Sequence, residues 1–424
     1  MMAVLLAANV IVPTKARAQT YGPLLDSEIP LSTQTGRNRG VDDRARPELR
    51  QQGLPLGGFR AFPQIGGGIG FTSNVVGSEQ GARSDGYAAA TARLDLRSQW
   101  SRHDLSVTGA YDGQRYFQTS AKNENGYLAA INGNLDVFDR SSLAASASLR
   151  RRYEDQTAAS FPASGGGSVA IDQTSLMLRG THALNQLRIT GSGDYNDFRY
   201  GRSVTLSGQR LDLGFRDHWV ARMSGRLEYA LSPDNAVFVQ GTYRHTDYDM
   251  KTTTANRTSD EWRAGVGAIA DVSSLIRIAG AVGYFRRTYD NPAFDSIGDL
   301  DVDFRLDYYV SPLTTVSTVF TRQLEEAIVA GSSGYMATHV GARVDHELLR
   351  NLIPYAYVDW VKESFRGADR DDRRWVAGLG AGYQPNRRWS VDFSASYVSR
   401  DSSGLQRGPR IKELRSLLTL KYNP

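Results

Sequence analysis

Charged side chains occur at every second position along parts of this chain, and a row of such groups could bind or catalyse. The clearest run extends from Leu300 to Val310, where Asp301, Asp303, Arg305 and Asp307 alternate with apolar residues. Arginine guanidinium groups can hold carboxylated or hydroxylated sugars through paired hydrogen bonds. They can equally pair with neighbouring aspartates and stiffen a wall. The sequence leaves both roles open.

The same alternation recurs along most of the chain and yields a set of candidate residues on one wet face. They are Arg93, Asp95, Arg97, Asp136, Arg150, Arg152, Arg188, Asp194, Arg222, Arg226, Glu228, Arg277, Asp301, Asp303, Arg305, Asp307 and Asp392.

Two further motifs have some features of a catalytic or a metal site. His245 with Asp247 could orient a nucleophilic serine, but a histidine at the base of a loop is the simpler interpretation. Asp299, Asp301 and Asp303 have the spacing of a calcium loop without its glycine and closing glutamate, so strand alternation explains them better. We therefore expect no catalytic residue, no metal and no cofactor.

Composition excludes several classes of function. The 424 residues include no cysteine, which removes thiolate metal sites, disulfides and cysteine nucleophiles. The 50 basic residues are nearly balanced by 45 acidic ones, giving a formal charge of +5. Nucleic-acid binders usually concentrate basic charge, so this balance argues against nucleic acid as a partner.

A period of two is typical of a strand with one apolar and one polar face. The charged face needs water, because burying unpaired charges costs several kcal/mol each. The apolar face needs hydrocarbon, and strands of about ten residues suit the wall of a membrane barrel. A soluble propeller or β-helix is the alternative, but it would leave many charges unsatisfied.

Short turns alternate with longer polar stretches, as in barrels that have short periplasmic turns and longer extracellular loops. Turns are expected near Arg102, Arg140, Asn185, Pro233, Ser273, Ser311, Arg350 and Pro385. The pattern predicts an all-β fold, a transmembrane antiparallel β-barrel of about 18 strands (roughly 16–18).

Aromatic residues cluster near the expected strand ends. Trp and Tyr are favoured at the level of the lipid headgroups, because the ring is apolar and its polar tip reaches water. The candidates for the membrane interface are Trp100, Tyr127, Trp219, Tyr229, Trp262, Trp375, Trp389 and Tyr422.

The N-terminal region differs from the rest of the chain. Residues 1–18 have a short apolar run followed by Ala16-Arg17-Ala18, which predicts a secretory signal peptide; a single membrane anchor is the alternative. Residues 19–58 have scattered prolines and no apolar period, so we expect an extended periplasmic segment. That segment could instead plug the lumen of the barrel, which we place at residues 59–424.

Several motifs resemble the Putative beta-barrel porin 2 family. They are Val41-Asp-Asp-Arg-Ala-Arg-Pro-Glu-Leu, Gly57-Gly-Phe with Pro63, Gly70-Phe-Thr-Ser-Asn-Val, and Leu94-Asp-Leu-Arg-Ser-Gln-Trp-Ser-Arg-His. The resemblance implies an outer-membrane barrel of the kind often associated with exopolysaccharide or capsule gene clusters. It brings no catalytic residues with it.

We therefore expect a channel in the outer membrane of a Gram-negative bacterium, in contact with outer-membrane lipid. The favoured hypothesis is a passive conduit for secreted polysaccharide that works with periplasmic export or assembly proteins. A general or sugar-selective diffusion porin, a non-conducting adhesive or structural barrel, and an outer-membrane enzyme remain as alternatives.

Overall fold

The computed structural model describes residues 29, 31, 39–252, 256–327, 329 and 331–424. The predicted signal peptide therefore lies outside the described residues. Among the described residues, no helix has the length and apolar character to cross a membrane.

Eighteen long antiparallel strands form the wall. They are β2 (Phe59–Thr72), β3 (Asp85–Ser98), β4 (Asp104–Tyr116), β5 (Glu124–Phe138), β6 (Ser141–Tyr153), β7 (Ala170–Leu184), β8 (Leu187–Tyr200), β11 (His218–Ser232), β12 (Asn235–Tyr248), β13 (Ser259–Asp271), β14 (Ile276–Tyr289), β15 (Ile297–Ser311), β16 (Thr314–Glu325), β17 (Gly334–His346), β18 (Leu352–Arg366), β19 (Asp371–Tyr383), β20 (Trp389–Ser403) and β21 (Ile411–Tyr422).

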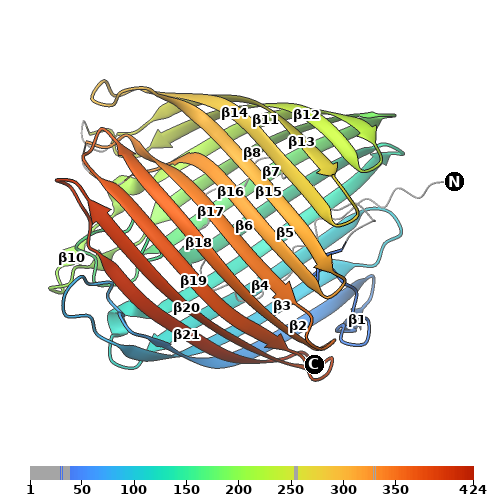
Figure 1. Ribbon diagram of the computed structural model, residues 1–424, viewed down its shortest axis with the longest axis horizontal. Coiled ribbons are helices and arrows are strands. Elements are labelled where there is room, and N and C mark those ends of the chain that lie inside the picture. The colour runs from blue at the N-terminus through green and yellow to red at the C-terminus, as the bar shows by residue number, and fades with distance from the viewer. Residues whose placement is uncertain (1–28, 30, 32–38, 253–255, 328, 330) are drawn as a thin grey trace.

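The sheet closes on itself. Each long strand pairs with the next one along the chain, and β2 pairs with β21 from Ile65 opposite Tyr422 to Thr72 opposite Arg415. Closure leaves no free edge, so every strand finds backbone partners on both sides, as a hydrocarbon environment requires. The predicted antiparallel barrel is confirmed, and its strands run obliquely around the wall (Figure 1).

Five short elements complete the fold. β1 (Leu54–Leu56) forms a hairpin with the start of β2, and Gly57 adopts a φ of +57° in the turn between them, which glycine tolerates without strain. β9 (Ser203–Val204) pairs with β10 (Arg210–Leu211) in the loop between β8 and β11. The 3-10 turn η1 (Ser120–Lys122) lies between β4 and β5, and η2 (Gly214–Arg216) follows β10 in the loop between β8 and β11.

The two ends of the barrel differ. Each of the eight turns expected from the sequence lies between two paired strands, at one end that we call the turn end. The longer connections gather at the opposite, loop end, where β10 is labelled in Figure 1, whereas β1 and the C-terminus lie at the turn end.

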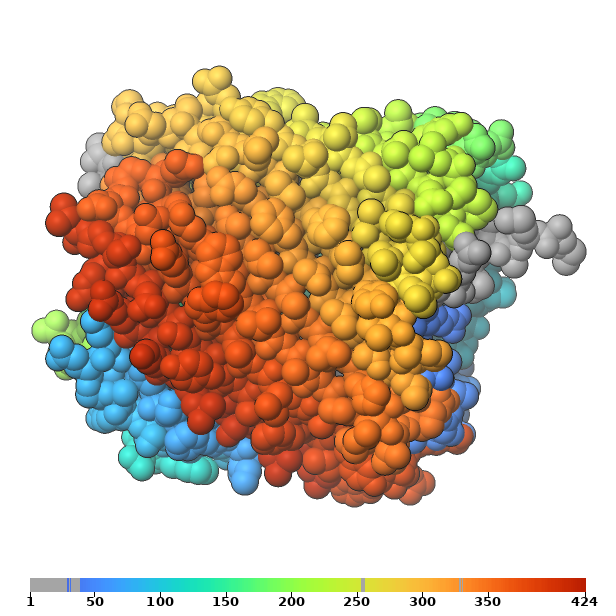
Figure 2. All heavy atoms as spheres, in the orientation of Figure 1, coloured from blue at the N-terminus to red at the C-terminus, as the bar shows by residue number. Residues whose placement is uncertain are grey.

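Strand β15 shows how alternation divides the wall into two faces. Leu300 is 54% exposed on the outside, whereas Asp307 on the other parity is 4% exposed. A slip of one residue in the register would exchange the two sets, so the apolar belt also fixes the strand pairing. The outer surface of β15 to β21 is a continuous wall of packed side chains (Figure 2).

Candidate functional site

The inner wall of the barrel is the candidate functional site. On β3, β8, β11 and β15, exposed apolar residues such as Leu94, Ile189, Met223 and Leu300 mark the outer face. The candidate residues of those strands lie on the other parity, and the same holds for Asp136 on β5, Arg150 and Arg152 on β6, Arg277 on β14 and Asp392 on β20. The structure therefore brings all the candidates of the wet face to one side of the sheet.

Some of these side chains pair along their own strand. Arg93 donates to Asp95 at 2.7 Å, and Arg305 donates to Asp307 at 2.8 Å. Each aspartate accepts one more bond from the neighbouring strand, from Thr108 and Ser317 respectively. Residues two apart share a face of a strand, so an arginine fork reaches its neighbour without backbone adjustment.

Other candidates pair across strands. Arg222 contacts Asp194 at 2.9 Å, Arg188 contacts Glu228 at 2.9 Å, and Arg277 approaches Asp271 at 3.6 Å. Asp392 contacts Lys421 at 3.0 Å, and Asp301 contacts Arg263 at 3.2 Å. The first four of these pairs link adjacent strands, whereas Arg263 on β13 reaches Asp301 on β15 past the intervening strand β14. Pairing of this kind stiffens the wall, which is one of the two roles that the sequence left open.

Three further arginines of the inner face have contacts of other kinds. The Arg97 guanidinium lies 5.1 Å above the ring of Phe62. Arg226 donates to Gln240 and to the backbone carbonyl of Ile29, a residue that precedes the barrel. Arg150 has an exposed side chain on the inner parity of β6. Arg97 and Arg150 can meet a solute in the lumen, whereas Arg226 is buried.

Sequence reasoning missed a buried charge cluster near the loop end. Arg287 contacts Glu261 and Glu326, each at 2.7 Å, and Arg244 contacts Glu326 at 3.1 Å. Burial alone would raise the pKa of Glu326, but Arg287 and Arg244 outweigh it and lower the pKa to about 2. The alternation of Glu261 and Arg263 around Trp262 could have placed Glu261 on the inner face. Glu326 lies in a loop, where no periodic pattern indicates its position.

Residues 154–169, the loop between β6 and β7, reach across the loop end of the barrel. Arg400 donates to the carbonyl of Ala158 at 3.2 Å, and Arg374 donates to the hydroxyl of Thr157 at 3.2 Å. Both arginines come from the distant strands β20 and β19. The Ala159 side chain is fully buried. This loop therefore narrows the loop end of the lumen.

Beneath that loop, the carboxylate of Asp372 balances the charge of the buried arginines. Its carboxylate accepts from Arg370 at 2.6 Å and from Arg400 at 2.7 Å. On the other side of the loop, Lys122 donates to Gln156 at 2.9 Å, and burial lowers the pKa of Lys122 to about 8. Hydrogen bonds from Arg374 and Arg400 on one side and from Lys122 on the other thus fix the position of the loop.

At the turn end, residues 39–53 lie against the inside of the barrel. We call this segment the strap. The Val41 backbone NH donates to Thr315 Oγ1 at 3.0 Å, and Thr315 lies directly opposite Tyr309 and Asp345, on the same face as Asp307. The sequence left an extended periplasmic segment and a plug open for residues 19–58, and the described part of that segment contacts the inner wall at the turn end.

Between the strap and the loop, the wall from β5 to β8 carries small polar side chains. Asn132, Ser146 and Ser148 share the inner parity with Asp136 and Arg150. Ser175 donates to Asn196 at 2.6 Å on the adjoining strands. Hydroxyl and amide groups of this kind can exchange hydrogen bonds with a hydrated solute.

The predicted interface aromatics fall at two levels. Trp100, Tyr229, Trp389 and Tyr422 lie at the turn end of their strands, and Tyr127, Trp219, Trp262 and Trp375 lie at the loop end. Trp219 and Tyr229 are ten residues apart on β11, which is about 33 Å at ~3.3 Å per residue. With a strand tilt of ~40°, the two levels are about 25 Å apart, the height expected of an apolar band.

The weaker motifs of the sequence have other partners. His245 contacts Asp260 at 2.8 Å rather than Asp247 and lies beside the ring of Trp219. Asp299 is held by Arg322 and Arg366, at 2.7 and 2.8 Å. The described residues contain no group of three or more metal-ligating side chains placed to hold an ion.

Comparisons with known proteins agree with this geometry. The family model described as Putative beta-barrel porin 2 matches residues 46–421. No curated protein matches. The structure of OccK2 (OpdF) from Pseudomonas aeruginosa, in complex with glucuronate, has a TM-score of 0.50 at 12% identity and covers 88% of this chain and 100% of its own. OccD3 (OpdP) from the same organism has a TM-score of 0.46 at 10% identity and covers 93% and 100%. At 12% identity the likeness to OccK2 shows the fold alone.

Proposed function

Because the chain belongs to the Putative beta-barrel porin 2 family, we propose that this porin-like channel of the Gram-negative outer membrane is a passive conduit for secreted exopolysaccharide or capsular polysaccharide. It is not an enzyme in this proposal. The polymer is delivered from the periplasm by export or assembly proteins and moves through the lumen without chemical change.

The polar inner wall from β5 to β8 is the observation that carries this proposal. Asn132, Ser146, Ser148 and Ser175 offer hydroxyl and amide groups along a strip between the strap and the loop of residues 154–169. Sugar hydroxyls can exchange hydrogen bonds to water for hydrogen bonds to these groups with little change in free energy, because the sugar and the wall groups are both hydrated in the open lumen. Arg150, exposed above the strip, can contact a carboxylated sugar.

A general or sugar-selective diffusion porin is the second candidate, and a separate observation favours it. The strap narrows the turn end and residues 154–169 narrow the loop end. A lumen restricted at both ends suits the passage of small solutes.

A deletion strain separates these functions. The conduit hypothesis predicts loss of surface polysaccharide on deletion and its recovery with the wild-type gene, whereas normal polysaccharide in the deletion strain would refute it. The porin hypothesis predicts unchanged polysaccharide, slower uptake of small sugars and steady conductance of the purified protein in planar bilayers. An adhesive barrel would give no conductance and would lose surface attachment while polymer export continues.

A further inference from the structure

We propose that the strap is a built-in constriction that sets both the width and the ion selectivity of the turn-end mouth. This inference rests on the proposed channel function. It adds that residues preceding the first barrel strand supply the selectivity charges, Asp42 and Asp43. A cluster of arginines around Glu347 anchors them.

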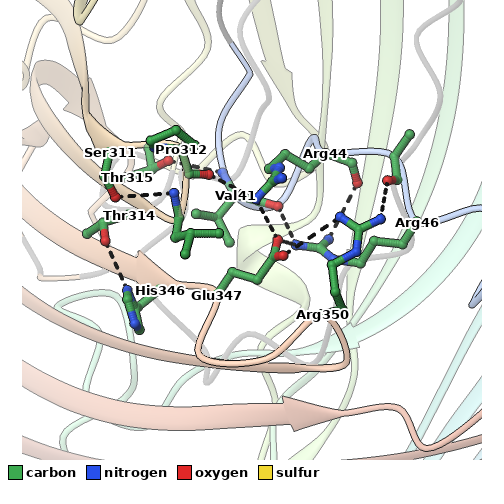
Figure 3. Close-up of polar contacts among 12 residues, drawn as sticks. Val41, Arg44, Arg46, Ser311, Pro312, Thr314, Thr315, His346, Glu347 and Arg350 are labelled. Atoms are coloured by element: carbon green, nitrogen blue, oxygen red, sulfur yellow. Dashed lines mark hydrogen bonds and ion pairs between the residues drawn. The ribbon is translucent and has the colours of Figure 1, made fainter.

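The anchor is a carboxylate shared by several guanidinium groups. Glu347, in the turn between β17 and β18, is buried and contacts Arg46 at 2.8 Å and Arg44 at 3.1 Å, with Arg350 at 3.7 Å (Figure 3). Arg44 also donates to the carbonyl of Pro312 in the turn between β15 and β16. A buried carboxylate needs such partners, and the strap provides two of the three.

Further bonds continue the strap along the mouth. Glu48 contacts Arg350 at 2.9 Å, and the Leu49 carbonyl accepts from Gln384 at 2.7 Å in the turn between β19 and β20. Gln51 then donates to the carbonyl of Pro63 on β2 at 2.9 Å. The strap is therefore fixed from β16 around to β2 before it enters β1.

The residues before the strap touch another part of the wall. The Ile29 carbonyl accepts from Arg226 on β11 at 2.6 Å. Leu31 packs against Phe238 and Ile269, on β12 and β13. Contacts of the N-terminal region are thus distributed on well-separated sides of the lumen.

The strap places two carboxylates among the charges of the inner wall. Asp42 lines a small cavity with Arg343, Asp345 and Asp392. Asp43 lies close enough to Arg305 and Asp307 for both to influence its titration, and burial is the largest cause of its raised pKa. Arg305 and Arg343 are already paired with Asp307 and Asp345 of the wall, so the carboxylates of Asp42 and Asp43 add negative charge to the mouth, which lowers its attraction for anions.

Two sets of variants test the separate contributions of charge and width. Asp42→Asn with Asp43→Asn should shift the reversal potential in a salt gradient toward anion selectivity, with conductance nearly unchanged. Arg44→Ala with Arg46→Ala should release the strap, raise single-channel conductance about twofold or more, and admit larger polyethylene glycols. Arg102→Ala, an exposed turn-end charge away from the strap, is the control and should do neither.

A reversible crosslink shows whether the strap itself causes the change. A Cβ at Gly40 would lie 3.6 Å from Thr315 Oγ1, so Gly40→Cys with Thr315→Cys can form a disulfide in a chain that has no other cysteine. In the Arg44→Ala, Arg46→Ala background, oxidation should restore the wild-type conductance and reduction should remove it.

Three outcomes would overturn the proposal: thiols that remain free after oxidation, conductance and selectivity equal to wild type in both sets of variants, or no conductance in any variant. A wild-type channel that is closed and opens only on release of the strap supports it. Normal polysaccharide in a deletion strain would refute the conduit but leave these bilayer results standing, so the two failures can be told apart.

Discussion

A single side chain on this barrel meets lipid or water according to the parity of its position. Leu306 pairs with Ile278 and Thr318 on the outer face, whereas Asp307 pairs with Arg277 and Ser317 on the inner face. Leu306 therefore requires a lipid environment and Asp307 an aqueous one, although the two residues are consecutive in the sequence.

Exchange of the Leu306 side chain tests this division. We expect Leu306→Arg to impair insertion, because an arginine on the lipid face near mid-membrane costs about 2–4 kcal/mol. Asp307→Asn should fold almost normally, since the amide still accepts from Ser317 and Arg305 remains in contact with water. Heat-modifiable migration on gels, which distinguishes folded from unfolded barrels, measures both. Equal behaviour of the two variants would contradict the face assignment.

The charge of Glu326 leads to a pH prediction. Its pKa of about 2 lies below the ordinary value of 4.5, so its contribution to stability is complete above pH 4.5 and is lost as the pH falls toward 2. The protection factor of the Ala327 amide, which is the ratio of its intrinsic to its measured exchange rate, should fall several-fold over this range in the wild type. Glu326→Gln should give a lower protection factor at pH 6 and little further change. A wild-type protection factor that is constant from pH 5 to 2 would contradict the role of the Glu326 ion pairs.

Most inner-wall residues could be predicted from the sequence because alternation alone decides their face. Glu261 and Arg287 follow the same rule and were open to the same argument. The ion-pair partners of inner-wall residues could not be predicted in this way, because the strand register brings together residues that are far apart along the chain. Asp194 with Arg222 is one such pair, and Glu326 with Arg244 is another.

At the scale of elements, the strands and turns have sequence signals and the inserted segments do not. Proline and asparagine marked turns such as Pro233 and Asn185, the latter with a φ of +50°. The strap contains Val41-Asp-Asp-Arg, which carried the resemblance to the family but has no periodicity to show where it lies. Its place depends on Glu347 and Thr315, about 300 residues later in the chain.

The loop of residues 154–169 depends on buried arginines of distant strands. Arg400→Gln should loosen it, because Asp372 and the Ala158 carbonyl each lose a charged donor, at a cost of about 1–3 kcal/mol. Faster proteolysis within residues 154–169 and a higher conductance are expected. Arg407→Gln, an exposed arginine that contacts Glu79, is the matched control. Equal protection in both variants would show that Arg400 does not hold the loop.

The whole molecule combines a closed wall with two insertions from opposite ends. The wall follows from a period of two repeated over 18 strands, which is why the fold could be predicted from the sequence. The width of the lumen depends on the strap and on residues 154–169, which lack a repeating pattern. Fold and passage are thus specified by different parts of the chain.

The central claim is that successive side chains face lipid and water in turn, and a cysteine scan of residues 300–307 tests it most directly. The chain has no cysteine, so each single substitution can carry a spin label without background. We predict that labels at 300, 302, 304 and 306 collide with oxygen dissolved in the bilayer, whereas labels at 301, 303, 305 and 307 collide with a water-soluble nickel complex. Accessibilities without a period of two, or with the two sets exchanged, would contradict the account.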